Sequence, residues 1–290
     1  MACDATRLRT ARYGQVYRLV HPGLSRLHVR AASNPLPGYT RALEDAMTNP
    51  RQLAERAEAK RGLPTGTDER FSGYGVMGLP FRSGHVLCLR RFPSSSIGPG
   101  YTSVWHRAPS GEWTFYQDVS PEQACSRYFG PSLRRALVRT VQVRWTESHA
   151  FSVEVDGGRA IQWDVRLAAP LAIRAMNVMA SMMPEALWHN QTVLRAMGSM
   201  ANRMLGAGRM VLAGRVPSGQ HFIANPLVAW TIPSSRARID GMDVGDPGPL
   251  PVQEHLGDFW IPQRGLFVIG RAFFEPFDPT RHRSDPHAEA

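Results

Sequence analysis

Hydrophobic and polar residues alternate over most of the chain between residues 71 and 275. Short segments rich in β-branched and aromatic residues are separated by turn sequences such as Asp156-Gly157-Gly158, which is typical of β-hairpins. We predict about eleven strands from this pattern, at 71–81, 85–92, 101–107, 112–119, 139–146, 149–156, 160–168, 209–216, 220–232, 236–241 and 258–275. Hairpins at this spacing, without regularly alternating strands and helices, predict a mainly β fold, an antiparallel barrel or sandwich.

A methionine-rich block with helical periodicity interrupts the strands. Residues 170–206 hold seven of the twelve methionines, and Met176, Met179 and Met183 follow the i, i+3, i+7 spacing of one helix face. Pro184 divides the block, so we predict an internal helical hairpin at 169–207. Methionine adapts to ligands of irregular shape, and we expect the methionine face to point into an enclosed cavity. A matching patch on a second chain would instead make it a homodimer interface.

The pattern predicts one large domain with two flanking segments. Residues 1–35 are basic and unpatterned and are expected to be a disordered extension. Residues 36–276 would form a single barrel-like domain that carries the helical insertion, and 277–290 a polar tail. One or two short helices are expected within 37–62, with a break at Asn49-Pro50.

Composition narrows the function classes. The net charge is +10, and six arginines against one aspartate in residues 1–35 supply half of it, so the remainder is ordinary for a domain of this size. Lys60 is the only lysine, and no strand or helix gathers cations and aromatics as nucleic-acid binders do, so we expect no nucleic-acid partner. No apolar run is long enough to span a membrane and no secretory leader is evident, which favours a cytoplasmic protein. Cys3, Cys88 and Cys125 are expected to be reduced thiols.

Three runs of sequence carry a resemblance to known proteins. VQVRWTESHAFSVEVDGGRAIQWDVRLAA (141–169) resembles strands of large lipocalin-like β-barrels, the group that includes carotenoid hydratases and the cyclases or Diels–Alderases of polyketide pathways. AGRVPSGQHFIANPLVAW (213–230) and LGDFWIPQRGLFVIGRAFFE (256–275) resemble a set of uncharacterised actinobacterial proteins. The resemblance covers about residues 68–276 and implies a lipocalin-like barrel with an apolar cavity and, in some members, isomerisation, hydration or cyclisation. No catalytic residue is carried over from it.

Familiar catalytic signatures are absent from the sequence. Gly73, Gly75 and Gly78 spell GxGxxG, but no strand precedes the motif and no helix follows it, so dinucleotide binding is not expected. His85, His221 and His255 lack metal-ligand spacing. We therefore expect neither a cofactor nor a metal.

The densest cluster of polar and aromatic residues lies in the hairpin 101–118. There His106, Asp118 and Tyr116 are candidate general acids or bases, and Trp105 and Tyr101 are candidate ligand contacts. The hairpin register should bring Trp105 close to Phe115. The structural alternative is that the tryptophans are core residues and that His106 caps a turn.

Two further segments supply candidates. GDFWIPQRG (257–265) contains Gln263 as a catalytic candidate, with Trp260 and Arg264 as candidate ligand contacts. The structural alternative is that this segment is a bulge at a strand corner. Trp188, beside His189 in the helical block, is the remaining ligand-binding candidate, together with Met176, Met179 and Met183.

Two functions fit this sequence. The first is binding of a hydrophobic molecule with cofactor-independent cyclisation, isomerisation or hydration of a polyketide- or isoprenoid-like substrate, in which the cavity shapes the substrate and a few polar groups polarise it. The second is a lipid or hydrophobic-ligand carrier without chemistry. Convergent acids or bases in the cavity would favour the enzyme, and apolar walls with scattered polar groups would favour the carrier.

Overall fold

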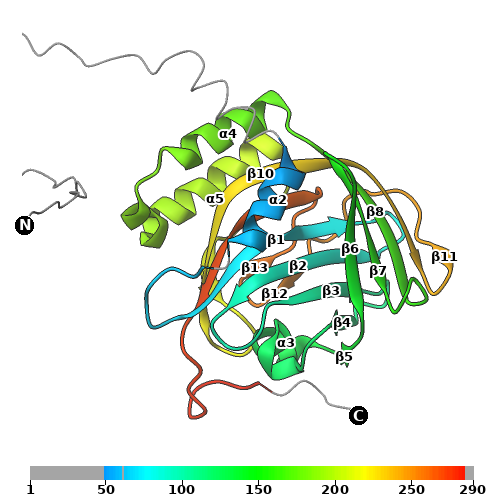
Figure 1. Ribbon diagram of the computed structural model, residues 1–290, viewed down its shortest axis with the longest axis horizontal. Coiled ribbons are helices and arrows are strands. Elements are labelled where there is room, and N and C mark those ends of the chain that lie inside the picture. Colours follow the sequence, from blue (N-terminus) through cyan, green and yellow to red (C-terminus); the bar gives the residue numbers. More distant parts are fainter. Residues whose placement is uncertain (1–48, 61, 285–290) are drawn as a thin grey trace, which may run out of the picture.

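One curled sheet organises the protein, whose computed structural model describes residues 49–60 and 62–284. The strand order is β5-β4-β3-β2-β1-β14-β10-β8-β7-β6, and β9 and β11 pair with β10 (Figure 1). Neighbouring strands are antiparallel except β4 and β5, which are parallel. The ends of this path, β5 and β6, do not pair with each other, so the sheet forms a half-barrel. The mainly β fold is therefore confirmed, while the predictions for 1–35 and for residues before 49 lie outside the described residues.

The strand boundaries follow the alternation closely. The strands are β1 (Glu69–Pro80), β2 (Val86–Ser95), β3 (Tyr101–Arg107), β4 (Trp113–Gln117), β5 (Arg135–Val138), β6 (Val141–Glu147), β7 (Ala150–Val155), β8 (Ile161–Ala168), β9 (Ala213–Arg215), β10 (His221–Ile239), β11 (Met242–Asp243), β12 (His255–Leu256), β13 (Phe259–Trp260) and β14 (Leu266–Phe274). Two predicted strands merge into β10, and the predicted 258–275 divides into β13 and β14, because Pro262 and the following turn interrupt it.

Helices are few and short. They are α2 (Pro50–Ala59), α3 (Ser126–Phe129), α4 (Leu171–Ser181) and α5 (Gln191–Leu205), with 3₁₀ turns at Pro121–Gln123, Gly130–Ser132 and Glu185–His189. Helix α2 starts where the sequence places a break, because the Asn49 side chain accepts a hydrogen bond from the Gln52 amide and Pro50 follows it. Within the described chain, no helix has the length and hydropathy to cross a membrane.

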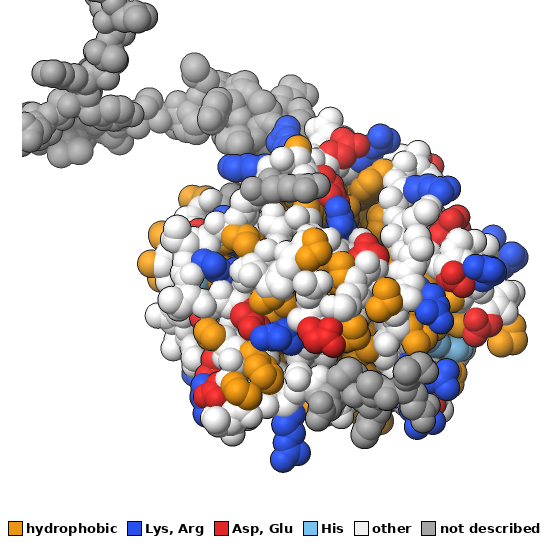
Figure 2. Space-filling model, turned by 60° about the horizontal axis from the view of Figure 1, so that its bottom comes forward, with side chains coloured by type: hydrophobic (Ala, Val, Ile, Leu, Met, Phe, Trp, Pro, Cys, Tyr) orange, Lys and Arg blue, Asp and Glu red, His pale blue; other side chains and the backbone are white. Residues whose placement is uncertain are grey.

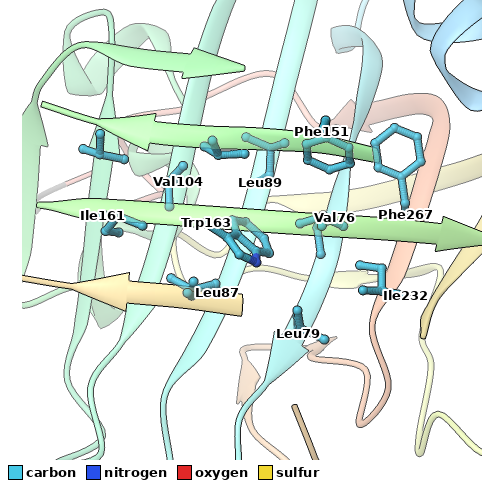
Figure 3. Close-up of a cluster of buried hydrophobic side chains, with 14 of the residues drawn as sticks. Val76, Leu79, Leu87, Leu89, Val104, Phe151, Ile161, Trp163, Ile232 and Phe267 are labelled. Carbon is cyan, nitrogen blue, oxygen red and sulfur yellow. The ribbon is translucent and has the colours of Figure 1, made fainter. Parts of the chain in front are cut away.

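The inner face of the half-barrel holds a closely packed apolar cluster. Figure 3 shows side chains of β1, β2 and β3, including Val76, Leu89 and Val104, meeting Phe151 and Trp163 from β7 and β8, whose strands run across the first group. Helix α2 adds Ala54, which is fully buried, at the edge of this cluster. The two halves of the curled sheet are thus joined by a common core.

The outer face of β2 and β3 carries a second cluster, and strict alternation separates the two. On β2, Val86, Cys88 and Phe92 belong to the outer cluster, while Leu87 and Leu89 belong to the inner one. Helix α3 and the small β12–β13 hairpin cover the outer cluster (Figure 1).

Helices α4 and α5 lie side by side at one end of the sheet (Figure 1), and α4 is fastened to β10. The amide of Asn177 exchanges two hydrogen bonds with the backbone of Ala229, at 3.0 and 2.9 Å. Met179, Met182 and Met204 are 47%, 77% and 41% exposed. The expectation that the methionine face points into an enclosed cavity is therefore wrong, because α4 buries Ile173 and Asn177 instead.

The surface mixes charges. On the face shown in Figure 2, basic and acidic side chains are interspersed with apolar ones, and neither sign covers a continuous area. Several charged side chains of the described chain are paired, as in Arg166–Glu147 at 3.1 Å. This pattern is that of an ordinary hydrated surface.

Candidate functional site

The outer cluster is built mainly from aromatic rings. Trp105 stacks on Phe115 with centroids 4.4 Å apart, which confirms the proximity predicted from the hairpin register. Phe129 and Phe259 contact the same indole at 4.8 and 5.9 Å. Tyr128 stacks on Phe274 at 3.8 Å. Four of these flat, rigid side chains form part of the wall of a pocket, namely those of Trp105, Phe129, Phe259 and Phe274.

The pocket lies between the outer cluster and strands β1, β10 and β14. Its volume is about 120 Å³. The residues that line it are Gly73, Tyr74, Met77, Arg90, Phe92, Trp105, Cys125, Phe129, Met210, Val211, Leu212, Phe222, Ala224, Asn225, Pro226, Phe259, Trp260, Pro262, Val268, Gly270, Arg271, Ala272 and Phe274. The wall is overwhelmingly apolar.

Paired glycines leave part of this wall as bare backbone. Gly73 on β1 lies opposite Gly270 on β14, and both line the pocket. A Cβ atom at Gly270 would lie 2.2 Å from the Asn225 carbonyl oxygen, so only glycine fits there. The GxGxxG motif therefore serves close strand packing within β1, where Gly73 and Gly75 both lie against β2 carbonyls.

Arg90 is the charged residue buried in this wall, with 5% of its surface exposed. Its guanidinium donates to the backbone carbonyls of Val76, Leu89 and Met77 at 2.5, 2.8 and 3.3 Å. It also lies over the Trp105 ring at 4.3 Å and near the Phe259 ring at 5.5 Å. Burial lowers the pKa of Arg90, but an arginine still keeps its proton.

Cys125 also lines the pocket. Its Sγ lies 3.1 Å from the Tyr101 hydroxyl, and burial raises the pKa of the thiol. A protonated thiol is a poor nucleophile. Cys125 is therefore inert in this environment.

The lining contains no Asp, Glu, His or Lys. Tyr74 lines the pocket, but its hydroxyl donates to Glu58 at 2.9 Å, and burial followed by the Glu58 charge raises the pKa of this hydroxyl well above its usual range. Arg271 is paired with Glu185 at 2.6 Å. General acid–base groups are thus absent from the wall.

The four residues expected to be catalytic are dispersed. Asp118 accepts a hydrogen bond from the Thr102 amide at 2.7 Å, and Gln263 is tied to the backbone of Leu250 at 2.9 and 3.1 Å. Tyr116 packs against the inner cluster. None of the four, His106 included, lines the pocket.

His106 forms a pair with His85, whose Nδ1 lies 2.9 Å from the His106 Nε2. The rings stack at 5.2 Å. Alternation along β3 turns His106 to the same side as the inner-face residue Val104. Burial, and then the proximity of His85, lower the pKa of His106 to about 4, so the imidazole is neutral near pH 7.

The expected ligand contacts divide into two groups. Trp105 and Trp260 line the pocket. The others do not: Tyr101 and Trp188 are buried elsewhere, Arg264 is exposed, and Met176, Met179 and Met183 lie on or beside α4. The methionines that do line the pocket are Met77 and Met210.

Arg90 was missed by the sequence reasoning, although a signal was present. In the β2 run VLCLRRF, alternation requires one of the two adjacent arginines to face each side of the sheet. Since both faces of β2 are apolar, one arginine had to be buried in a core. No group of three or more His, Cys, Asp or Glu side chains suited to a metal occurs among the described residues.

No protein-family model matches the chain, and no curated protein matches it. An acetoacetate decarboxylase structure from Legionella pneumophila is similar with a TM-score of 0.36 and 11% identity, over 79% of this chain and 92% of that chain. A second acetoacetate decarboxylase structure gives a TM-score of 0.36 and 12% identity, over 76% and 90%. The function must therefore be argued from the pocket.

Proposed function

We propose that this protein binds a small hydrophobic molecule in the pocket on the outer face of β1–β3. The observation that carries this proposal is a preformed cavity of about 120 Å³ whose wall is almost entirely aromatic and aliphatic. Cavities of roughly 150 Å³ with such walls stay dry and take up benzene-sized molecules. An apolar group of that size is the occupant that the walls favour.

Binding without chemistry is the form of this function that the wall favours. General acid–base catalysis needs a titratable group within hydrogen-bond reach of the reacting atoms. The lining has no carboxylate, imidazole or lysine amine, and the hydroxyl of Tyr74 is engaged by Glu58. The protein is thus best described as a carrier or receptor for its ligand.

Cofactor-independent cyclisation, isomerisation or hydration is the second candidate, and one observation favours it. Arg90 places a fixed positive charge against an apolar space, where it would stabilise negative charge that develops on a substrate oxygen. Shape control by the rigid aromatic wall would supply the rest of the catalysis.

Toluene titration tests the binding function. Toluene should stabilise the protein against thermal unfolding, by about 2–4 °C at roughly ten times its dissociation constant. Ala272→Phe fills the pocket from β14 and should weaken toluene binding at least about tenfold, with overpacking costing about 1–3 kcal/mol of stability.

The matched control is Ala175→Phe, on the exposed side of α4, which should bind toluene like the native chain. Equal toluene affinity in the two variants would show that the molecule binds elsewhere. Absence of any toluene binding to the native chain would overturn the proposal.

A further inference from the structure

We infer that the ligand carries a carboxylate, which pairs with Arg90 while the apolar remainder fills the aromatic pocket. This inference rests on the proposed function and names the class of molecule that the same site takes: a small hydrophobic carboxylic acid. Three observations lead to it: the unused donors of Arg90, its lack of a carboxylate partner, and the single unpaired charge in the pocket wall.

The hydrogen bonds of Arg90 do not use all the N–H groups of its guanidinium. A guanidinium carries five N–H groups. Three of its contacts are to backbone carbonyls, those of Val76, Leu89 and Met77, and the structure gives this side chain no further hydrogen-bond partner among the described residues. Two N–H donors therefore stand beside an apolar space that holds a ligand-sized cavity.

Arg90 also lacks a carboxylate partner within the described chain. Its neighbour Arg91 shows the contrast, because Arg91 pairs with Glu58 in two bonds of 2.8 and 2.7 Å while remaining partly exposed. A buried charge without a counter-ion is costly, and proteins generally pair it or neutralise it. Arginine does not deprotonate, so the remaining solution is an anion supplied from outside the chain.

The rings around Arg90 fix the orientation of its donors. Trp105 and Phe259 lie against the guanidinium at 4.3 and 5.5 Å, so the face of the cation is covered and its edge donors remain. Edge donors match the two oxygens of a carboxylate in one plane.

The charge of the pocket selects a monoanion. The other cation in the wall, Arg271, is already paired with Glu185 at 2.6 Å. One unpaired positive charge balances one carboxylate. A phosphate group carries close to two negative charges, so part of its charge would stay unbalanced in the pocket. The small cavity then limits the apolar part to roughly one ring or a short branched chain.

Three probes that share a phenyl ring separate this inference from the proposed function. They are 3-phenylpropionate, its primary amide and toluene, measured by calorimetric titration into the full chain at about pH 7, where the acid is ionised. We expect the carboxylate to bind at least about tenfold more tightly than the amide. Equal binding of acid and amide would overturn the inference while leaving the proposed function intact; no binding of any probe would overturn both.

Substitution of Arg90 completes the test. Arg90→Met should weaken 3-phenylpropionate binding about thirtyfold and leave toluene binding within about threefold of the native value. Arg144→Met removes the same charge from an exposed position on β6 and should change neither affinity. Arg90→Lys retains the charge without the planar guanidinium, so its affinity for 3-phenylpropionate should lie between those of the native chain and of Arg90→Met. This variant keeps the test informative if Arg90→Met does not fold. Unchanged binding of the carboxylate to a folded Arg90 variant would overturn the inference.

Discussion

The inner and outer faces of strands β1–β3 are both covered by apolar side chains, but they are packed in different ways. The inner face meets β7 and β8 across a core that mixes many branched aliphatic side chains with the rings of Phe151, Trp163 and Phe267 (Figure 3). The outer face is covered by aromatic rings, α3 and the β12–β13 hairpin, and a cavity of about 120 Å³ remains beside it. In the inner core, branched aliphatic side chains fill the spaces between the rings. The outer cluster is richer in rings, whose edge and stacked contacts leave gaps between their planes.

The polar exceptions on the two faces sharpen this difference. His106, on the inner side, is neutral near pH 7, because burial and the nearby His85 lower its pKa to about 4. Arg90, on the outer side, remains charged. In the closed inner core, the buried titratable group is a histidine that can become neutral. Beside the pocket, the buried group is an arginine that stays charged and can pair with an anion there.

Trp163→Ala should give the largest loss of stability, because it opens a cavity in the inner core. Trp163 is 1% exposed, and its Nε1 donates to Ser235 Oγ at 2.8 Å. We expect a loss of about 3–5 kcal/mol in the free energy of unfolding, measured by urea denaturation. Toluene affinity of the folded fraction should stay within about threefold of the native value, since distant sites act independently.

The neighbouring Asp164→Ala, whose side chain lies on the exposed side of β8, is the control, and it should change stability by about 0.5 kcal/mol or less. A Trp163 variant that loses ligand affinity while staying stable would mean that the two faces are not separate units.

His106→Gln should reduce the pH dependence of the free energy of unfolding, an effect of intermediate size. The unfolded chain binds a proton at His106 with a pKa of about 6.5, whereas the folded chain binds it at about 4. Between these values the unfolded state takes up more protons, so the contribution of this group to stability is complete above about pH 6.5 and falls by about 3 kcal/mol as the pH is lowered through 4.

Urea denaturation at about pH 7 and pH 4.5 measures this dependence. The drop between the two pH values should be smaller in His106→Gln than in the native protein. An identical drop in both proteins would show that other groups cause it.

Phe259→Leu should have the smallest effect on stability and a clear effect on binding. Phe259 is only partly buried and lines the pocket beside Trp105 and Arg90. We expect a loss of about 1 kcal/mol in unfolding free energy and a shift in ligand preference from toluene towards larger alkylbenzenes, measured by thermal shift. A large loss of stability with unchanged preference would make the outer face a second core and not a binding wall.

Most of the fold could be predicted from the sequence because period-two alternation is local. FSVEVD and AIQWDVRL each became a strand at the predicted place, and Asp156-Gly157-Gly158 forms the turn between them with all three residues at positive φ. Strand β5 was missed because its four residues bury little and pair in parallel with β4. The merging of two predicted strands into β10 was also missed, since Pro233-Ser234-Ser235 reads locally as a turn, which the pairing of β10 with β8 overrides through a bulge between Thr231 and Ser234.

The site was harder to predict, because a pocket wall is assembled from distant segments. Trp105 and Trp260 were identified from local clusters of aromatic residues. Met77 and Phe274 join them through the long-range pairing of strands, and Met210 through the segment between α5 and β9, and no local pattern encodes either. The methionines of α4 and α5 were misassigned because helical periodicity identifies an apolar stripe without showing how much of it a neighbour covers, and Met182 remains 77% exposed.

The pairing of β1 with β14 has a consequence for how this chain is made. Glu69 lies opposite Phe274, so β1 finds one of its two neighbours only after β2 to β13 have been synthesised. Until then β1 presents an unpaired, apolar edge, which is the kind of surface that recruits other chains. Contacts of such long sequence separation also slow folding. The order of synthesis therefore makes the last strand, β14, the closing step that joins the two halves of the sheet.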